Sequence, residues 1–211
     1  MDNIEQLIDT LSKDAQAVKP APHPFKLCLL WIAGGTVYLA AALALTGLRP
    51  DWAESFRNPL FVAEIIMLLG LFIVTALSAS LLAFPDLHQK QRIAYAPLGQ
   101  ALLFLGVLIL AWRADTPAAP LPEHSIECTA SILLTMLLPA VWTLYSMRKF
   151  ASTHSRVAGS VALLSAFSVG ALWLRLHEVN DSILHVVEWH YVPAFGIGVL
   201  GLWLGKVLLK W

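Results

Sequence analysis

Charged residues are rare in six long apolar stretches, and this scarcity limits the folds open to the chain more than any other feature. A bilayer core about 30 Å thick requires roughly 20 mostly apolar residues in a helix. Apolar residues make up 58% of the 211 and charged residues only 13%. The runs are continuous rather than alternating, so each predicts a membrane-spanning helix. The predicted spans cover residues 27–48, 59–84, 93–112, 127–147, 157–174 and 191–209.

The predicted fold is therefore an all-α polytopic membrane protein. Six transmembrane helices follow a short amphipathic cytosolic N-terminal helix. Residues 1–26 are predicted to form the cytosolic segment with a Pro-rich tether, and residues 27–211 the transmembrane domain. Because the formal net charge is zero, the composition offers no argument for a nucleic-acid partner, and none is predicted.

Lysine and arginine are distributed unevenly between the two sides of these spans. Ten of them lie on one side and four on the other. Cytoplasmic loops carry the excess of these residues, so the bias predicts that both termini are cytosolic. The predicted cytosolic residues are Lys13, Lys19, Lys26, Lys90, Arg92, Arg148, Lys149, Arg156, Lys206 and Lys210, and the outer ones are Arg49, Arg57, Arg113 and Arg175.

Residues 4–18 show an apolar stripe at helical spacing, with acidic and polar side chains on the other face. Prolines 20, 22 and 24 then end the helix and form a stiff tether. An isolated helix this short is marginal in water, so the stripe needs a surface. A groove on a soluble partner suits the acidic segment better than anionic lipid, and a disordered terminus is the alternative. The predicted partner-binding residues are Ile4, Leu7, Ile8, Leu11, Asp14 and Val18.

Short motifs at both ends of the chain carry a resemblance to a known family. The motifs are Leu7, Ile8, Leu11, Asp14, Val18 and Pro20 near the start, and Leu176–His177, Asn180–Ser182, Trp189–His190, Pro193 and Lys210–Trp211 near the end. In this order the chain resembles the NrsF-type family of six-span anti-sigma factors. The resemblance implies a bacterial inner-membrane protein, surrounded by lipid, that sequesters an ECF-type sigma factor through its cytosolic N-terminal segment. An envelope, metal or oxidative stress signal would release the sigma factor.

One position departs from the pattern that the resemblance implies. Members of the family often carry a cysteine directly after the Leu-His element, where this chain has Glu178. Cys128 matches the other cysteine region, whereas Cys28 lies near the predicted cytosolic end of the first span. The sequence therefore argues against a simple disulfide switch on the outer side.

Imidazole, carboxylate and thiol groups gather on the predicted outer side, and these groups bind zinc or copper. Glu64 lies inside the second span, where a carboxylate is costly and marks a function or a buried partner. If their stretch is helical, His185 and Glu188 share a face. The alternative is a structural hydrogen-bond network tying spans two, four and six together. The candidate signal-sensing or metal-binding residues are Glu64, His124, Glu127, Cys128, His177, Glu178, Asp181, His185, Glu188 and His190.

A second class of function stays open at this point. A small membrane transporter or a metal-dependent membrane enzyme could use the outer His and Glu residues. No nucleophile motif appears, and no pair of spans is interrupted as in many transporters, so no enzyme is predicted. Gly201 and Gly205 form a G-x-x-x-G motif, which serves either packing within the chain or a homodimer.

Overall fold

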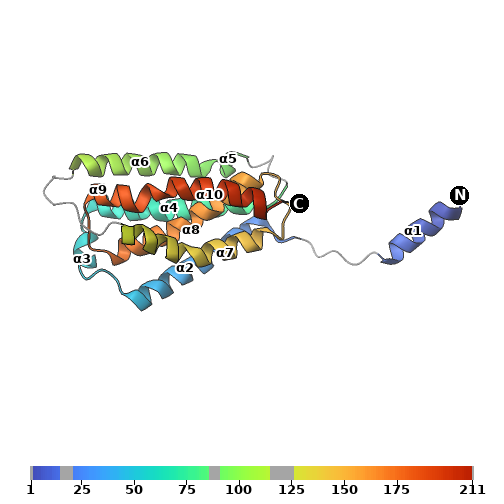
Figure 1. Ribbon diagram of the computed structural model, residues 1–211, viewed down its shortest axis with the longest axis horizontal. Coiled ribbons are helices and arrows are strands. Elements are labelled where there is room, and N and C mark those ends of the chain that lie inside the picture. Colours follow the sequence, from blue (N-terminus) through green and yellow to red (C-terminus); the bar gives the residue numbers. More distant parts are fainter. Residues whose placement is uncertain (1, 15–20, 86–90, 115–125, 211) are drawn as a thin grey trace.

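The described chain contains six helices long and apolar enough to cross a membrane, which confirms the predicted fold class (Figure 1). The computed structural model describes residues 2–14, 21–85, 91–114 and 126–210. Its elements are α1 (Asp2–Asp14), α2 (Pro24–Thr46), α3 (Trp52–Ser55), α4 (Pro59–Leu82), α5 (Gln91–Ala94), α6 (Ala96–Ala114), α7 (Ile126–Met147), α8 (Ser155–His177), α9 (Ile183–His185), a π-helix (Val186–Tyr191) and α10 (Pro193–Leu208).

The first five spans begin and end within a few residues of their predicted limits, but the sixth does not. It covers Ile183–Leu208 rather than 191–209, because α9, the π-helix and α10 follow one another without a loop. His185 and His190 lie in this added part and are buried. Hydropathy treats such side chains as facing lipid or water, whereas here they face other helices of the protein. The predicted start of the sixth span at residue 191 was therefore wrong.

Helix α8 forms the centre of the bundle and packs against α2, α4, α7 and α10. Small residues bring α8 and α10 together. Gly159 of α8 faces Gly201 and Gly205 of α10, and a Cβ atom at Gly201 would lie 2.5 Å from the Cα of Ser160. The Ser160 hydroxyl donates a hydrogen bond of 2.9 Å to the carbonyl of Gly198. The G-x-x-x-G motif therefore serves packing within the chain.

The end of α2 directs an arginine into the bundle. Gly47 has a φ of +87°, in the region that L residues rarely adopt, and ends the helix. Two residues later, the Arg49 N–H donates a hydrogen bond of 2.9 Å to the carbonyl of Leu176 in α8. This turn fixes the loop after α2 against the end of α8.

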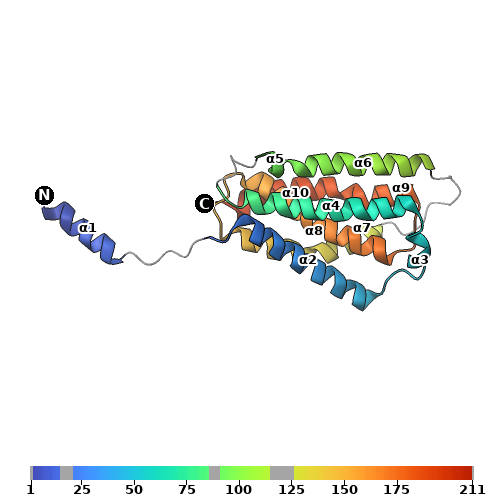
Figure 2. The ribbon, with the colours of Figure 1, turned by 180° about the vertical axis from the view of Figure 1, so that it is seen from behind.

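The two ends of the bundle differ in what they hold. Helix α1 lies beyond one end of the bundle, and the end of α10 lies at that same end (Figures 1 and 2). The short helices α3 and α9 lie at the opposite end, which we call the α9 end. Six spans return the chain to its starting side, as the orientation prediction requires.

Candidate functional site

A buried ion pair joins α4 to α8 near the α9 end. Arg175 donates two hydrogen bonds of 2.8 Å to Glu64, one to each carboxylate oxygen. The Tyr191 hydroxyl of the π-helix donates a third to the same carboxylate. Both charged side chains are buried. Two parallel N–H···O bonds are the strongest geometry of this pair, so Glu64 fixes three spans relative to one another.

Arg49 extends this ion pair into the loops. Its fully buried side chain binds both Asp51 and Asp181, with hydrogen bonds of 2.7–2.9 Å, and Arg175 also donates to Asp181 at 3.1 Å. The Phe61 ring lies about 5 Å from each guanidinium. The hydrogen bond from Arg49 lowers the pKa of Asp51 to about 2, and its carboxylate partners raise the pKa of Arg49. We call these residues with Glu64 and Tyr191 the arginine network.

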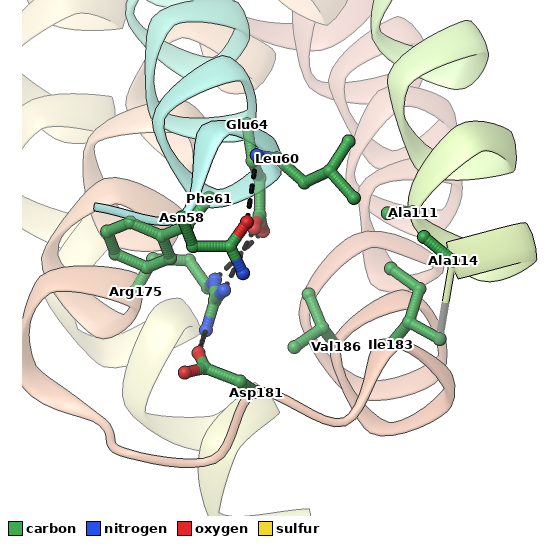
Figure 3. A pocket seen from close by; sticks show the side chains of 10 residues that line it. All are labelled: Asn58, Leu60, Phe61, Glu64, Ala111, Ala114, Arg175, Asp181, Ile183 and Val186. Carbon is green, nitrogen blue, oxygen red and sulfur yellow. Dashed lines mark hydrogen bonds and ion pairs between the residues drawn. The ribbon is translucent and has the colours of Figure 1, made fainter. Parts of the chain in front are cut away.

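A pocket of about 150 Å³ opens beside the arginine network. Figure 3 shows Glu64, Arg175 and Asp181 in line on one wall, with Ile183 and Val186 on another. The remaining lining residues are Asn58, Leu60, Phe61, Ala111 and Ala114. The pocket lies between α4, α6 and the start of the sixth span, and of the network's acids on its wall only Asp181 is about half exposed.

A second polar cluster lies next to this network and contains Cys128, Glu178, His185 and His190; we call it the Cys128 cluster. Cys128 Sγ lies 3.5 Å from Glu178 Oε1 and 3.6 Å from His185 Nε2. His185 Nε2 lies 3.3 Å from Glu178 Oε1, and His190 Nε2 lies 3.0 Å from Glu178 Oε2. Burial acts to raise the pKa of Glu178, but its contacts with His190 and His185 outweigh burial and hold the pKa below its ordinary value.

The π-helix explains how two histidines five residues apart face the same carboxylate. In an α-helix, five residues would place them about 140° apart around the axis. A π-helix closes i→i+5 hydrogen bonds, so residues five apart lie nearly above one another. The bond of 2.9 Å from Val192 N–H to the Val187 carbonyl has this spacing. As a result, His185 and His190 are fully buried on one side, with their ring centres 5.2 Å apart.

The structure brings six of the ten predicted outer-side residues into these two groups. Cys128, Glu178, His185 and His190 form one group, and Glu64 and Asp181 belong to the arginine network. The arginine network joins spans two, five and six, so span five was missing from the prediction, while the Cys128 cluster joins spans four and six as predicted.

The other four predicted residues lie elsewhere. Glu127 and Glu188 are exposed, so the prediction that Glu188 shares a face with buried His185 was wrong. The His177 ring stacks on Trp173, and its Nδ1 lies 2.9 Å from the Gly47 carbonyl. His124 lies outside the described residues.

Arg49, Asp51 and Tyr191 were not predicted as site residues from the sequence, and Arg175 was predicted to lie in an outer loop. The sequence feature that could have revealed this network is Arg175, which lies close enough to a predicted span to need a buried partner. Glu64 is the acid that meets this need.

The predicted N-terminal helix is present as α1, with its apolar stripe uncovered. Ile4, Leu7, Ile8 and Leu11 are each 58–66% exposed. Asp14 ends the helix, and Val18 lies outside the described residues. Whether the stripe binds a partner stays a prediction.

These features define a six-span helical membrane protein with an exposed amphipathic helix at one end and buried polar groups at the other. The chain belongs to the NrsF family, described as negative regulator of sigma F, whose family model matches residues 11–211. The match confirms the resemblance to this family. Because the family regulates transcription and is non-enzymatic, it also confirms the prediction that the protein is not an enzyme.

Two relatives match along nearly their whole length. "Anti-sigma-F factor NrsF" of Caulobacter vibrioides (strain NA1000 / CB15N) is 27% identical over 212 residues, which cover 98% of this chain and 99% of that protein. "Probable anti-sigma-F factor NrsF" of Azospira oryzae (strain ATCC BAA-33 / DSM 13638 / PS) is 27% identical over 217 residues, with the same coverage. No solved structure matches the chain.

Proposed function

We propose that this protein is an inner-membrane anti-sigma factor that sequesters an ECF-type sigma factor at the cytosolic side. Membership of a family described as negative regulator of sigma F supports the class of partner. The single observation that carries the mode of binding is α1, whose apolar stripe lies outside the bundle. Burying that stripe in a groove of the sigma factor would remove it from water and tie the sigma factor to the membrane.

The charge of α1 favours a protein groove over the lipid surface. The helix contains Asp2, Glu5, Asp9 and Asp14 against a single basic residue, Lys13, which pairs with Asp9 at 2.6 Å. Helices that lie on anionic lipid are usually rich in Lys and Arg on the polar face. Lipid instead contacts the bundle, where apolar side chains point outward along α6: Leu98, Leu102, Leu105 and Ile109.

Release of the sigma factor requires a connection from the α9 end to α2, the first span of the bundle and the helix that follows α1 in the chain. Trp173 of α8 donates a hydrogen bond of 3.0 Å to Thr46 at the end of α2. Nearer the other end, Trp31 of α2 donates one of 3.0 Å to Ser146 of α7. A signal shifts the bundle only if it binds two arrangements of these helices with different affinity. An envelope, metal or oxidative stress signal at the α9 end is the input we propose.

The binding mode is tested with the full-length protein in lipid nanodiscs and purified candidate ECF sigma factors of the host. The variant Leu7→Asp with Leu11→Asp places two charges on the stripe. The matched control, Gln6→Asp with Thr10→Asp, adds the same charge at the same four-residue spacing on the polar face. We expect the stripe variant to lose sigma-factor binding at least about 100-fold, because a desolvated charge disrupts an apolar contact, and the control to stay within about tenfold.

Equal binding by the wild type and both double variants would contradict the proposal for α1. Loss of binding in both variants would point to charge rather than to the stripe. Membrane insertion and thermal unfolding of each variant, measured in the same nanodiscs, show whether the bundle is intact.

A further inference from the structure

We propose that the Cys128 cluster is a tetrahedral binding site for a divalent transition metal ion of the zinc class. Its four ligands would be Cys128 Sγ, one carboxylate oxygen of Glu178, and Nε2 of His185 and His190. One potential ligand atom from each residue lies within 4.8 Å of the others. Sequence spacing alone does not show this site, because the four residues come from α7, the loop after α8, α9 and the π-helix.

The distances between the ligand atoms fit a bound ion. At typical zinc bond lengths, a tetrahedron separates sulfur from nitrogen or oxygen by about 3.6 Å, and nitrogen from oxygen by about 3.4 Å. The observed sulfur distances are 3.5 Å to Glu178 and 3.6 Å to His185. The nitrogen–oxygen distances are 3.3 Å for His185 and 3.0 Å for His190. These four distances lie close to the edges of such a tetrahedron, and one ligand atom of each residue lies within 4.8 Å of the others.

Missing hydrogen bonds within the cluster independently point to a ligand. In the described part of the chain, Glu178 Oε2 and His190 Nε2 are buried and make no hydrogen bond. Glu178 Oε2 and His190 Nε2 lie 3.0 Å apart, at ion-pair distance when His190 is protonated, but without hydrogen-bond geometry. Buried polar atoms normally find a partner. A metal ion between these two atoms would satisfy both.

The donor set selects the class of metal. Two imidazoles, a thiolate and a carboxylate are a mixture that suits zinc and related borderline ions, whereas calcium and magnesium require oxygen ligands. The charges also balance, because a thiolate and a carboxylate neutralise a divalent cation at an otherwise buried position. On binding, the Cys128 thiol would release its proton to solvent and form the metal–sulfur bond as a thiolate.

A metal at this site would also act on the arginine network, an effect whose regulatory use rests on the proposed function. His190 would be a ligand, and the next residue, Tyr191, donates its hydroxyl to Glu64. Thr129, next to Cys128, already joins α7 to the π-helix through a hydrogen bond of 2.6 Å to the Trp189 carbonyl. Binding or loss of the ion would therefore change how α7 and the sixth span pack.

The site is tested on the full-length protein, purified in detergent and freed of metal, with Co²⁺ as a spectroscopic probe and Zn²⁺ as competitor. We expect one Co²⁺ per chain, intense visible bands typical of tetrahedral cobalt, and a thiolate-to-cobalt charge-transfer band in the near ultraviolet. Zn²⁺ should displace the cobalt. Cys128→Ser should remove the charge-transfer band, and His190→Gln should weaken binding by about tenfold or more.

Matched controls use residues of the same kind outside the cluster. Cys28→Ser changes the other cysteine, and Glu188→Gln changes an exposed acid near the site; neither should alter the spectrum or the affinity. Unchanged far-ultraviolet circular dichroism shows that each variant is folded. The proposal is overturned if wild-type protein binds no cobalt, if the charge-transfer band survives Cys128→Ser, or if Cys28→Ser also removes it. Because no sigma factor is present, these outcomes are independent of the proposed function.

Discussion

Replacing Glu64 with glutamine keeps the size of the side chain but removes the charge that Arg175 binds with two hydrogen bonds of 2.8 Å. The remaining acid near Arg175 is Asp181, which is 3.1 Å away and about half exposed, so it does not replace Glu64. Removing one partner of a buried ion pair costs about 3 to 5 kcal/mol. A neutral hydrogen bond between membrane helices averages about 0.6 kcal/mol. We expect the free energy of unfolding to fall by about 3 kcal/mol, near the lower limit, because Asp181 retains part of the interaction.

The assay is reversible unfolding of the full-length protein in mixed micelles with increasing sodium dodecyl sulfate, followed by far-ultraviolet circular dichroism. Glu127→Gln, at an exposed acid, is the control and should change stability by less than about 0.5 kcal/mol. The double variant Glu64→Gln with Arg175→Gln leaves no unpaired charge and should recover part of the loss. A loss below about 1 kcal/mol for Glu64→Gln would refute the ion pair as a buried, charged interaction.

Two further predictions concern packing and pH. Gly201→Leu should lower the melting temperature, because a Cβ atom there would meet the backbone of α8, whereas Gly196→Leu, with no atom within 4 Å, should leave it unchanged. An equal effect at both glycines, read by thermal unfolding, would contradict the close approach of α8 and α10. The pKa of Asp51 is lower in the folded state, so its contribution to stability is present above the ordinary pKa near 4 and lost as pH falls towards about 2. Unfolding curves measured from pH 5 to 2 should show this loss, and Asp51→Asn should make the curve flatter in that range.

The spans were predictable from sequence because lipid imposes a simple requirement on them. Every backbone polar group must be hydrogen-bonded inside the segment, so a long continuous apolar run forms a membrane-spanning helix. The predicted start of the second span at residue 59 agrees with α4, where the Asn58 side chain accepts a hydrogen bond of 3.0 Å from the Leu60 N–H and Pro59 occupies the first helical position. Local patterns of this kind need no knowledge of the neighbouring helices.

The polar groups of the α9 end were only partly predictable, because their partners are distant in sequence. Chemistry alone selected Glu64, Cys128 and Glu178 as candidates. Their partners depend on which helices meet: Glu64 and Arg175 are 111 residues apart, and Cys128 and Glu178 are 50 apart. Hydropathy also placed His185 and His190 in a loop, since it carries no information on burial by protein.

The π-helix joins the two polar groups through consecutive residues, and this arrangement constrains how the α9 end can change. His190 faces Glu178 and the Cys128 cluster, while Tyr191 reaches Glu64 and the arginine network. Converting this stretch to an α-helix would rotate His190 away from His185, because five residues would then differ by about 140°. The π-helix therefore keeps both histidines of the Cys128 cluster against Glu178. A ligand that holds His185 and His190 together stabilises the π-helix, and through Tyr191 it stabilises the contact between α4, α8 and the sixth span.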